Sequence, residues 1–138
     1  MKVLFLCTLN AVRSPIAEAL ARHYYPQHEF HSAGLIAGPP DYFAIEVMQE
    51  IGLDITNRTS RSFENVKHKN FDLVIILSDE AREETMSLLE KHKLKYEFWH
   101  DIPTPADMSG SRLMRLFSYR EIRDKIKARI KSWKPDGK

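Results

Sequence analysis

Blocks of apolar residues alternate with mixed blocks along the chain, and this alternation predicts strands and helices in turn. Residues 3–6 and 71–77 are almost continuously apolar, which is typical of strands buried on both faces of a sheet. Residues 29–32 and 96–99 are shorter candidates for strands. The run 71–77 is the clearest of the four, and we expect it near the centre of the sheet.

Helices are predicted between these strands and after the last one. Residues 15–21 form a helix-favouring run, with Ser14 suited to the cap. Residues 41–51 and the segment after Ser78 fit helices as well. From Leu116 onward apolar residues recur every three or four positions, as on a helix that lies against a sheet.

Strands that alternate with helices predict a doubly wound α/β fold, in which a four-stranded parallel sheet is flanked by helices on both faces. The length of 138 residues fits a single domain spanning residues 1–138. In such folds ligands bind at the carboxyl ends of the strands, near the point where the strand order reverses. The segment after the first strand is therefore the first place to look for a site.

Composition and charge exclude several classes of protein. Apolar residues make up 43% and charged residues 29%, as in ordinary globular proteins. The net charge is +2 with both signs mixed, which argues against a nucleic-acid or membrane-surface partner, and the basic stretch 112–138 is interpreted as the solvated face of a helix. We find no apolar run long enough to span a membrane, no secretion signal and no metal-ligand spacing among the histidines. A cytoplasmic protein without a metal or cofactor is expected.

Cys7 is the one cysteine of the chain and follows the first predicted strand. Five residues separate it from Arg13, after which the first helix is predicted to start. A short loop that enters a helix turns backbone N–H groups toward one point, where the helix dipole favours an anion. Arg13 adds a planar donor fork that can hold two phosphate oxygens, and the same field favours the thiolate form of Cys7.

This arrangement predicts a thiolate nucleophile within a phosphate-binding loop. In-line attack by the sulfur would form a phosphocysteine, with charge on the equatorial oxygens stabilised by backbone N–H groups and Arg13, and water would then cleave the intermediate. A cysteine after a buried strand is often only a small apolar filler. Its position before a helix that opens with arginine favours the catalytic interpretation. The predicted phosphate-binding residues are Thr8, Leu9, Asn10, Ala11, Val12, Arg13 and Ser14.

Residues 3–19 read Val-Leu-Phe-Leu-Cys-x-x-Asn-x-x-Arg-Ser-Pro-x-Ala-Glu-Ala. This segment resembles the N-terminal signature of the low-molecular-weight protein tyrosine phosphatase family, whose superfamily includes thioredoxin-coupled arsenate reductases. The resemblance extends over nearly the whole chain and implies a four-stranded parallel sheet, with Cys7 as nucleophile and Arg13 as phosphate ligand. It also implies that Asn10 braces the loop and that Ser14 assists the sulfur.

The late loop departs from the family pattern. Family members usually carry an Asp-Pro pair there, whose aspartate protonates the leaving oxygen, whereas Thr104 precedes Pro105 in this chain. A threonine cannot act as a general acid near neutral pH. Asp101 is the first candidate to replace the missing aspartate, Asp107 is the second, and a reaction without a general acid is the third. Either aspartate could instead be a turn or cap residue.

Three further features bear on function. Val12 stands where a second cysteine is common, so Cys7 is predicted to over-oxidise more readily. Arsenate reductases of the superfamily that relay electrons through internal thiols need more than one cysteine, so that mechanism is excluded and only an external thiol would serve. Tyr42 and Phe43 could line one wall of a slot for an aromatic phosphate, or could simply pack a helix against the sheet.

The main hypothesis from the sequence is a phosphomonoester hydrolase, specifically a protein tyrosine phosphatase acting on a phosphorylated protein or a small phosphomonoester. An arsenate reductase that uses an external thiol is the second hypothesis. The third is a phosphate- or phosphoprotein-binding module with little turnover. The physiological substrate and the oligomeric state stay open at this stage.

Overall fold

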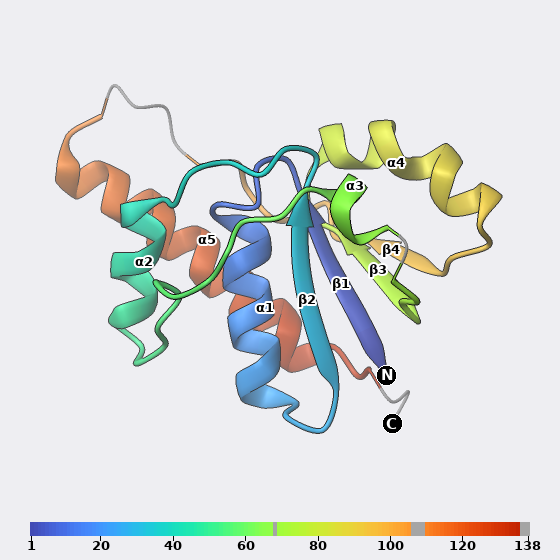
Figure 1. Cartoon of the computed structure of the whole chain (residues 1–138). Helices are drawn as coiled ribbons and strands as arrows, with labels where there is room; N and C mark the ends of the chain where they lie inside the picture. The colour runs from blue at the N-terminus through green and yellow to red at the C-terminus, as the bar shows by residue number, and fades with distance from the viewer. Residues whose placement is uncertain (68, 106–109, 136–138) are drawn as a thin grey trace.

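The computed structural model describes residues 1–67, 69–105 and 110–135. A single sheet contains β1 (Lys2–Cys7), β2 (Glu29–Gly34), β3 (Leu73–Ile76) and β4 (Tyr96–Phe98). These strands pair in parallel in the order β2-β1-β3-β4 (Figure 1). The predicted four-stranded parallel sheet is confirmed, and β3 lies at its centre beside β1.

Five helices connect or follow these strands in the described part of the chain. They are α1 (Arg13–Tyr24), α2 (Tyr42–Gln49), α3 (Phe63–Val66), α4 (Asp79–Lys91) and α5 (Arg112–Ser132). The short helix α3 was not predicted, because four residues are too few to show a helical period. Ser78 caps α4 as predicted, since its side chain accepts a hydrogen bond from the Ala81 N–H.

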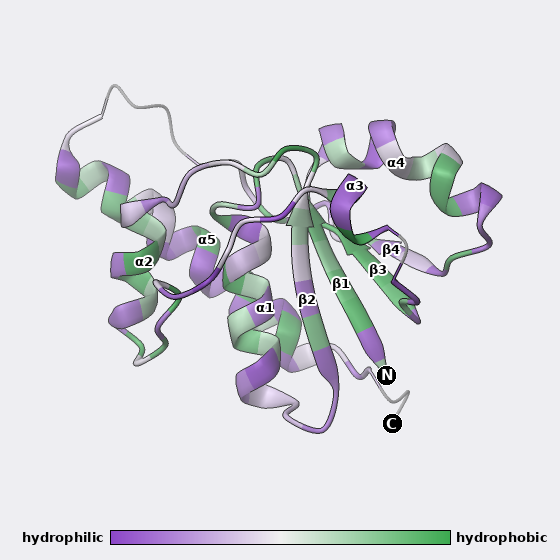
Figure 2. Ribbon diagram, in the orientation of Figure 1, coloured by the Kyte–Doolittle hydropathy of each residue, from purple (hydrophilic) through white to green (hydrophobic). Residues whose placement is uncertain are grey.

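Apolar side chains of β1 alternate between two cores, one on each face of the sheet. Val3 and Phe5 belong to a cluster with residues of α1, α2 and α5, whereas Leu4 and Leu6 pack with residues of α3 and α4. Figure 2 shows the hydrophobic character of β1 and β3 between these two layers of helices. Because both faces are covered, the carboxyl ends of the strands remain as the edge where a ligand can bind.

Helix α1 starts differently from the prediction. Its cap position is Val12, which makes no side-chain cap hydrogen bond, and Arg13 is its first residue. The prediction that Ser14 caps this helix is wrong, because the Ser14 hydroxyl is within hydrogen-bonding distance of Cys7 and Asn10 instead. A helix start without a side-chain cap leaves its first N–H groups available to an anion.

Gly34 allows the loop after β1 to lie directly against the end of β2. The strand register pairs Cys7 with Gly34. A Cβ atom added to Gly34 would lie 2.6 Å from the Asn10 nitrogen and 2.7 Å from the Leu9 carbonyl carbon. The next residues continue this contact, because the Ile36 N–H donates to the Thr8 carbonyl over 3.1 Å. The loop 8–12 is therefore held by a neighbour that has no side chain.

Neither a membrane span nor a metal-binding cluster is found among the described residues. No helix in residues 1–67, 69–105 and 110–135 is both long and apolar enough to cross a membrane. Within the same ranges, no group of three or more His, Cys, Asp or Glu side chains is placed to hold a metal ion.

Candidate active site

A pocket of about 330 Å³ opens where β1 and β3 end. Five of the predicted phosphate-binding residues line it together with Cys7, and the other walls come from α2, α4, the late loop and α5. Its lining residues are Cys7, Thr8, Leu9, Ala11, Val12, Arg13, Asp41, Glu80, Thr104, Pro105 and Tyr119. The topology thus brings residues from distant parts of the sequence around one thiol.

The sulfur of Cys7 lies beside the hydroxyl of Ser14. Cys7 is 2% exposed, and its Sγ is 2.9 Å from Ser14 Oγ. Asn10 Nδ2 donates to the same Ser14 oxygen over 2.8 Å, so that oxygen already accepts one hydrogen bond. The Ser14 hydroxyl hydrogen has two acceptors within reach, the Ala33 carbonyl oxygen at 3.3 Å and the Cys7 sulfur, and when it points at the sulfur it can hydrogen-bond to a thiolate.

Arg13 is fixed at the end of β3. Its side chain is mostly buried, and one terminal N–H donates to the Leu77 carbonyl over 3.3 Å. A guanidinium carries five N–H donors, so this anchor still permits a two-pronged contact with phosphate oxygens. The position of Arg13 as the first residue of α1 also places its charge at the positive end of the helix.

Asn10 and Ser14 lie behind the loop and do not line the pocket. Asn10 is fully buried and has a φ angle of 53°, a left-handed conformation that asparagine tolerates better than most residues. Its side-chain amide donates to Ser14 and to Ser32 Oγ, the latter over 3.0 Å. Its carbonyl oxygen Oδ1 accepts from the Arg61 backbone N–H over 2.9 Å. This geometry is what the bracing role implied by the family resemblance requires.

Sequence reasoning missed Arg58, which holds Asn10 from the other side. One terminal nitrogen of Arg58 donates to the Asn10 backbone carbonyl over 3.0 Å, and the other donates to Asn10 Oδ1. Burial lowers the pKa of Arg58, while the charges of Glu18 and Cys7 act in the opposite direction. No local pattern marks this arginine, since only the tertiary fold carries residues 53–61 behind the phosphate-binding loop.

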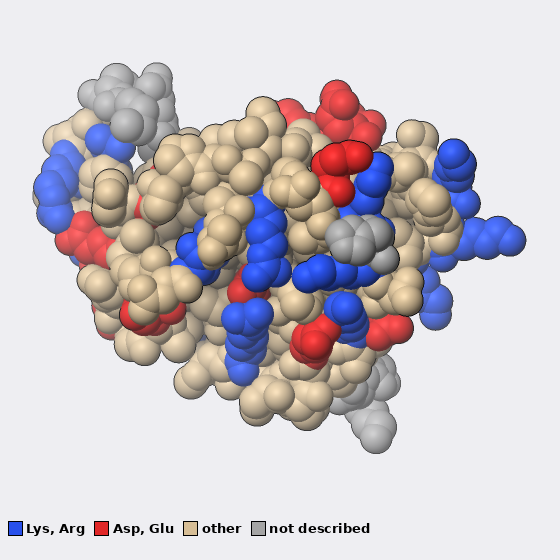
Figure 3. All heavy atoms as spheres, in the orientation of Figure 1, with Lys and Arg blue, Asp and Glu red and all other residues tan. Residues whose placement is uncertain are grey.

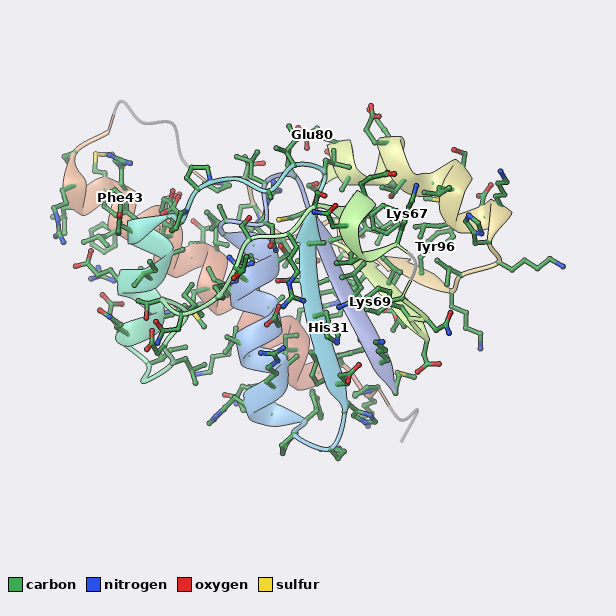
Figure 4. All side chains as sticks on the ribbon, in the orientation of Figure 1. His31, Phe43, Lys67, Lys69, Glu80 and Tyr96 are labelled. Carbon is green, nitrogen blue, oxygen red and sulfur yellow. The ribbon has the colours of Figure 1, made fainter. Side chains whose placement is uncertain are left out.

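Thr8 links the loop to α4. Its hydroxyl lies 3.0 Å from Ser78 Oγ and 3.3 Å from Glu80 Oε2. Figure 4 labels Glu80 above the carboxyl ends of the strands, near the start of α4. In the sequence, Glu80 belongs only to the segment after Ser78 that is predicted as a helix. The structure adds that its side chain is part of the pocket wall.

Another wall of the pocket comes from the start of α2 and from α5. The Tyr119 hydroxyl donates to Asp41 Oδ2 over 2.7 Å, and Asp41 Oδ1 accepts from the Phe43 and Ala44 N–H groups over 2.9 and 3.1 Å. Burial, the hydrogen bond to Asp41 and the charge of Asp41 all raise the pKa of Tyr119, so its hydroxyl stays protonated. Asp41 therefore acts as cap of α2 and as a pocket residue at once.

The two aromatic residues considered for the wall lie elsewhere. Phe43, labelled in Figure 4, packs against Tyr119 with ring centroids 5.4 Å apart, so this contact joins helix α2 to helix α5 and not to the sheet. Tyr42 is 80% exposed. Neither lines the pocket, and Tyr119 supplies the aromatic side chain that does. Sequence reasoning had assigned Tyr119 only to the apolar stripe of the last helix.

The late loop contributes Thr104 and Pro105 to the pocket. Asp101 is exposed and does not line the pocket, and its Oδ1 atom lies 3.3 Å from a terminal nitrogen of Arg129. Asp107 lies outside the described residues. The general-acid role of Asp101 therefore stays a prediction, and it requires the ion pair with Arg129 to break.

A parallel α/β sheet with a thiol, an arginine and a helix start around one anion pocket defines a class of cysteine-dependent phosphate-handling enzymes. The family model described as low molecular weight phosphotyrosine protein phosphatase matches residues 2–136, and the chain belongs to this family. The resemblance seen in the sequence is thereby confirmed.

Relatives within this family carry two kinds of name. The arsenate reductase of Shouchella clausii (strain KSM-K16) is 34% identical over 136 residues, which covers 98% of this chain and 96% of the relative. The tyrosine phosphatase Wzb from Escherichia coli K30, solved in complex with sulphate, is 25% identical with a TM-score of 0.79, covering 96% of this chain and 94% of its own. An arsenate reductase solved in the phosphate binding state is 28% identical with a TM-score of 0.69, covering 95% and 94%.

Proposed function

We propose that this chain hydrolyses phosphomonoesters through a phosphocysteine intermediate on Cys7, with phosphotyrosine in proteins as the substrate class. The observation that carries the proposal is Cys7 in the lining of a pocket that Arg13 also lines, with its sulfur 2.9 Å from the Ser14 hydroxyl oxygen. A merely structural cysteine needs neither a hydroxyl partner nor an arginine beside it, whereas a nucleophilic thiolate benefits from both.

The reaction has two displacement steps at phosphorus. The thiolate of Cys7 attacks the phosphorus in line, an S–P bond forms, and the bond to the leaving oxygen breaks. Backbone N–H groups of the loop and the guanidinium of Arg13 stabilise charge on the three equatorial oxygens. Water then attacks the phosphocysteine, the S–P bond breaks, inorganic phosphate leaves, and Ser14 again stabilises the released thiolate.

The leaving oxygen needs a proton when it is a poor leaving group. Asp101 is proposed as its source, which requires the late loop to turn this carboxyl toward the pocket. We expect Asp101→Asn to lower turnover of an alkyl phosphate at least tenfold while changing turnover of an aryl phosphate much less, because an aryl oxide leaves without full protonation. Equal effects on both substrates, or none, would assign the proton to another donor.

The first experiment is turnover of an aryl phosphate from pH 4.5 to 8 by the wild type and by Cys7→Ser. The expected result is hydrolysis by the wild type and none by the variant, with a phosphorylated Cys7 detectable by rapid acid quench and mass spectrometry. Wild-type protein that binds phosphate but does not hydrolyse the aryl phosphate would refute the hydrolase proposal.

A second candidate function is arsenate reduction with an external thiol, which the names of the curated relatives favour. The chain has one cysteine, so two molecules of external thiol must supply the two electrons. The thiolate of Cys7 would displace water from arsenate, one external thiol would attack the Cys7 sulfur and release arsenite, and a second would free Cys7 as the external disulfide forms. Arsenite production that depends on glutathione and on Cys7, without aryl phosphate turnover, would establish this candidate in place of the first.

A further inference from the structure

The pocket that is built for an anion also carries two carboxylates. Asp41 and Glu80 both line it, from α2 and α4 respectively. Among the described residues that line the pocket, Arg13 is the one basic side chain, and its position at the loop commits it to the phosphate. Carboxylates repel a phosphate dianion, so the catalytic step alone does not explain why two of them line the pocket.

Glu80 is positioned at the pocket by one side-chain contact and by its place in α4. The Thr8 hydroxyl lies 3.3 Å from its Oε2 atom, and its backbone belongs to the first turn of α4. Around it, α4 exposes a run of acidic side chains, Asp79, Glu80, Glu83 and Glu84. Figure 3 shows acidic side chains gathered over this end of the molecule. The basic residue within the run, Arg82, places its guanidinium 5.1 Å from the ring centroid of Phe98, on β4.

Asp41 is equally constrained and is suited to act as an anion. Its two oxygens accept three hydrogen bonds, from the Phe43 and Ala44 N–H groups and from the Tyr119 hydroxyl. Glu80 is an exposed acidic side chain in the wall of the same pocket. Both side chains therefore present negative charge to whatever adjoins the bound phosphate.

We infer that this pocket selects phosphorylated residues that are flanked by a basic side chain, a Lys- or Arg-flanked phosphopeptide. The inference rests on the proposed function. While the loop and Arg13 hold the phosphate, a neighbouring ammonium or guanidinium group meets Glu80 and Asp41, and a neighbouring carboxylate is repelled. An exposed ion pair changes binding affinity by up to about fivefold. Replacing a flanking cation by a flanking anion turns an attraction into a repulsion, so the difference in binding free energy between the two peptides is about twice that of one ion pair. Peptides that differ only in the sign of the flanking charge should therefore differ about tenfold or more at low salt.

The test uses binding to Cys7→Ser protein, so that it does not depend on turnover. Two phosphotyrosine peptides, identical except for Lys or Glu on each side of the phosphotyrosine, are compared by fluorescence anisotropy at about 20 mM and 300 mM salt. The same peptides are then measured with Cys7→Ser carrying Glu80→Gln. Cys7→Ser carrying Glu90→Gln is the matched control, because Glu90 lies ten residues further along α4, about 15 Å away.

The expected result is a Lys-to-Glu affinity ratio of about ten that shrinks in high salt, falls at least threefold with Glu80→Gln, and is retained with Glu90→Gln. A ratio near one, an equal loss in both variants, or no binding of either peptide would overturn the inference. Failure of the hydrolase proposal is seen separately, as absence of aryl phosphate turnover by the wild type.

Discussion

Replacing Arg58 with methionine should loosen the phosphate-binding loop without altering any residue that lines the pocket. Arg58 donates to the Asn10 carbonyl over 3.0 Å and to Asn10 Oδ1, and its second terminal nitrogen is 3.5 Å from Ser32 Oγ. Methionine keeps much of the apolar stem and removes every one of these donors. The change therefore isolates the guanidinium, which acts on the thiol only through Asn10 and through its charge.

The size of the effect follows from those contacts. Each good hydrogen bond from a charged donor contributes roughly 1.5–3 kcal/mol, and the Arg61 N–H still satisfies Asn10 Oδ1 in the variant. We therefore expect a loss of about 2–4 kcal/mol in the free energy of unfolding. Asn10 would also be less constrained in its left-handed conformation, so Ser14 would be less well placed beside Cys7. A misplacement of about 1 Å at a catalytic group costs roughly a hundredfold in rate.

The assay is alkylation of Cys7 by iodoacetamide as a function of pH, with kcat/KM for an aryl phosphate measured in parallel. Since loss of a nearby positive charge disfavours a thiolate, the pH of half-maximal alkylation should rise in Arg58→Met. Arg58→Lys should recover part of the shift, and added methylguanidine should recover more, because it restores the planar donor fork.

Arg61→Met is the matched control for this prediction. Arg61 lies three residues further along the same loop, and its side chain approaches His31 Nδ1 at 3.5 Å, whereas it holds Asn10 through its backbone N–H. This variant removes one positive charge and should leave alkylation nearly unchanged. Equal shifts in the two variants would refute the reasoning, because the effect would then come from net charge and not from the contacts of Arg58.

Three further predictions follow from the site and the helix interface. Ser14→Ala should raise the pH of half-maximal Cys7 alkylation and lower kcat/KM roughly 10–100-fold, because a hydrogen bond to a charged sulfur is lost; unchanged alkylation would contradict this. Gly34→Ala should weaken phosphate binding, measured by calorimetry, and destabilise the fold by about 1–3 kcal/mol, because the new Cβ would lie 2.6 Å from the Asn10 nitrogen. Hydrogen bonds from Arg120 and Arg123 hold the pKa of Glu50 at about 2, so its contribution is present above the ordinary value of 4.5 and is lost as the pH falls toward 2. Urea unfolding should therefore show a wild-type advantage over Glu50→Gln of about 1 kcal/mol at pH 6 that disappears near pH 2.

Much of the fold could be predicted because its strands are buried on both faces. The apolar runs 3–6 and 71–77 correspond to β1 and β3. Strand β1 is longer than its predicted run by one residue at each end, whereas β3 is shorter than its predicted run. The last helix begins at Arg112, earlier than the Leu116 stripe indicates, because its first turn exposes Leu113 and Met114 and so carries no buried period. Apolar periodicity arises from burial, so a helical turn that is not buried cannot be predicted from the apolar pattern.

The candidate site divides in the same way. Cys7 and Arg13 could be found because the chemistry lies within seven residues between a strand and a helix. Arg58, Asp41 and Tyr119 could not, since each resembles an ordinary loop, cap or core residue and gains its place only through long-range packing. Tyr119 is 78 residues from the Asp41 that its hydroxyl contacts. A sequence motif can therefore point to the candidate nucleophile and to nearby groups such as Asn10 and Ser14, but not to groups that distant segments supply.

Charge of opposite sign is placed behind the loop and in the pocket wall. Behind the loop, Arg58 is held against Asn10, which in turn contacts Ser14 beside the sulfur, so positive charge lies where it stabilises the thiolate. In the pocket wall, Asp41 and Glu80 add negative charge. A phosphate bound in the pocket would be attracted by the positive charge behind the loop. A cation next to that phosphate would be attracted by Asp41 and Glu80. Under the proposed function, the residues behind the loop act on the thiol and those in the pocket wall act on the substrate, so variants of Arg58 should alter thiol reactivity and variants of Glu80 should alter peptide preference.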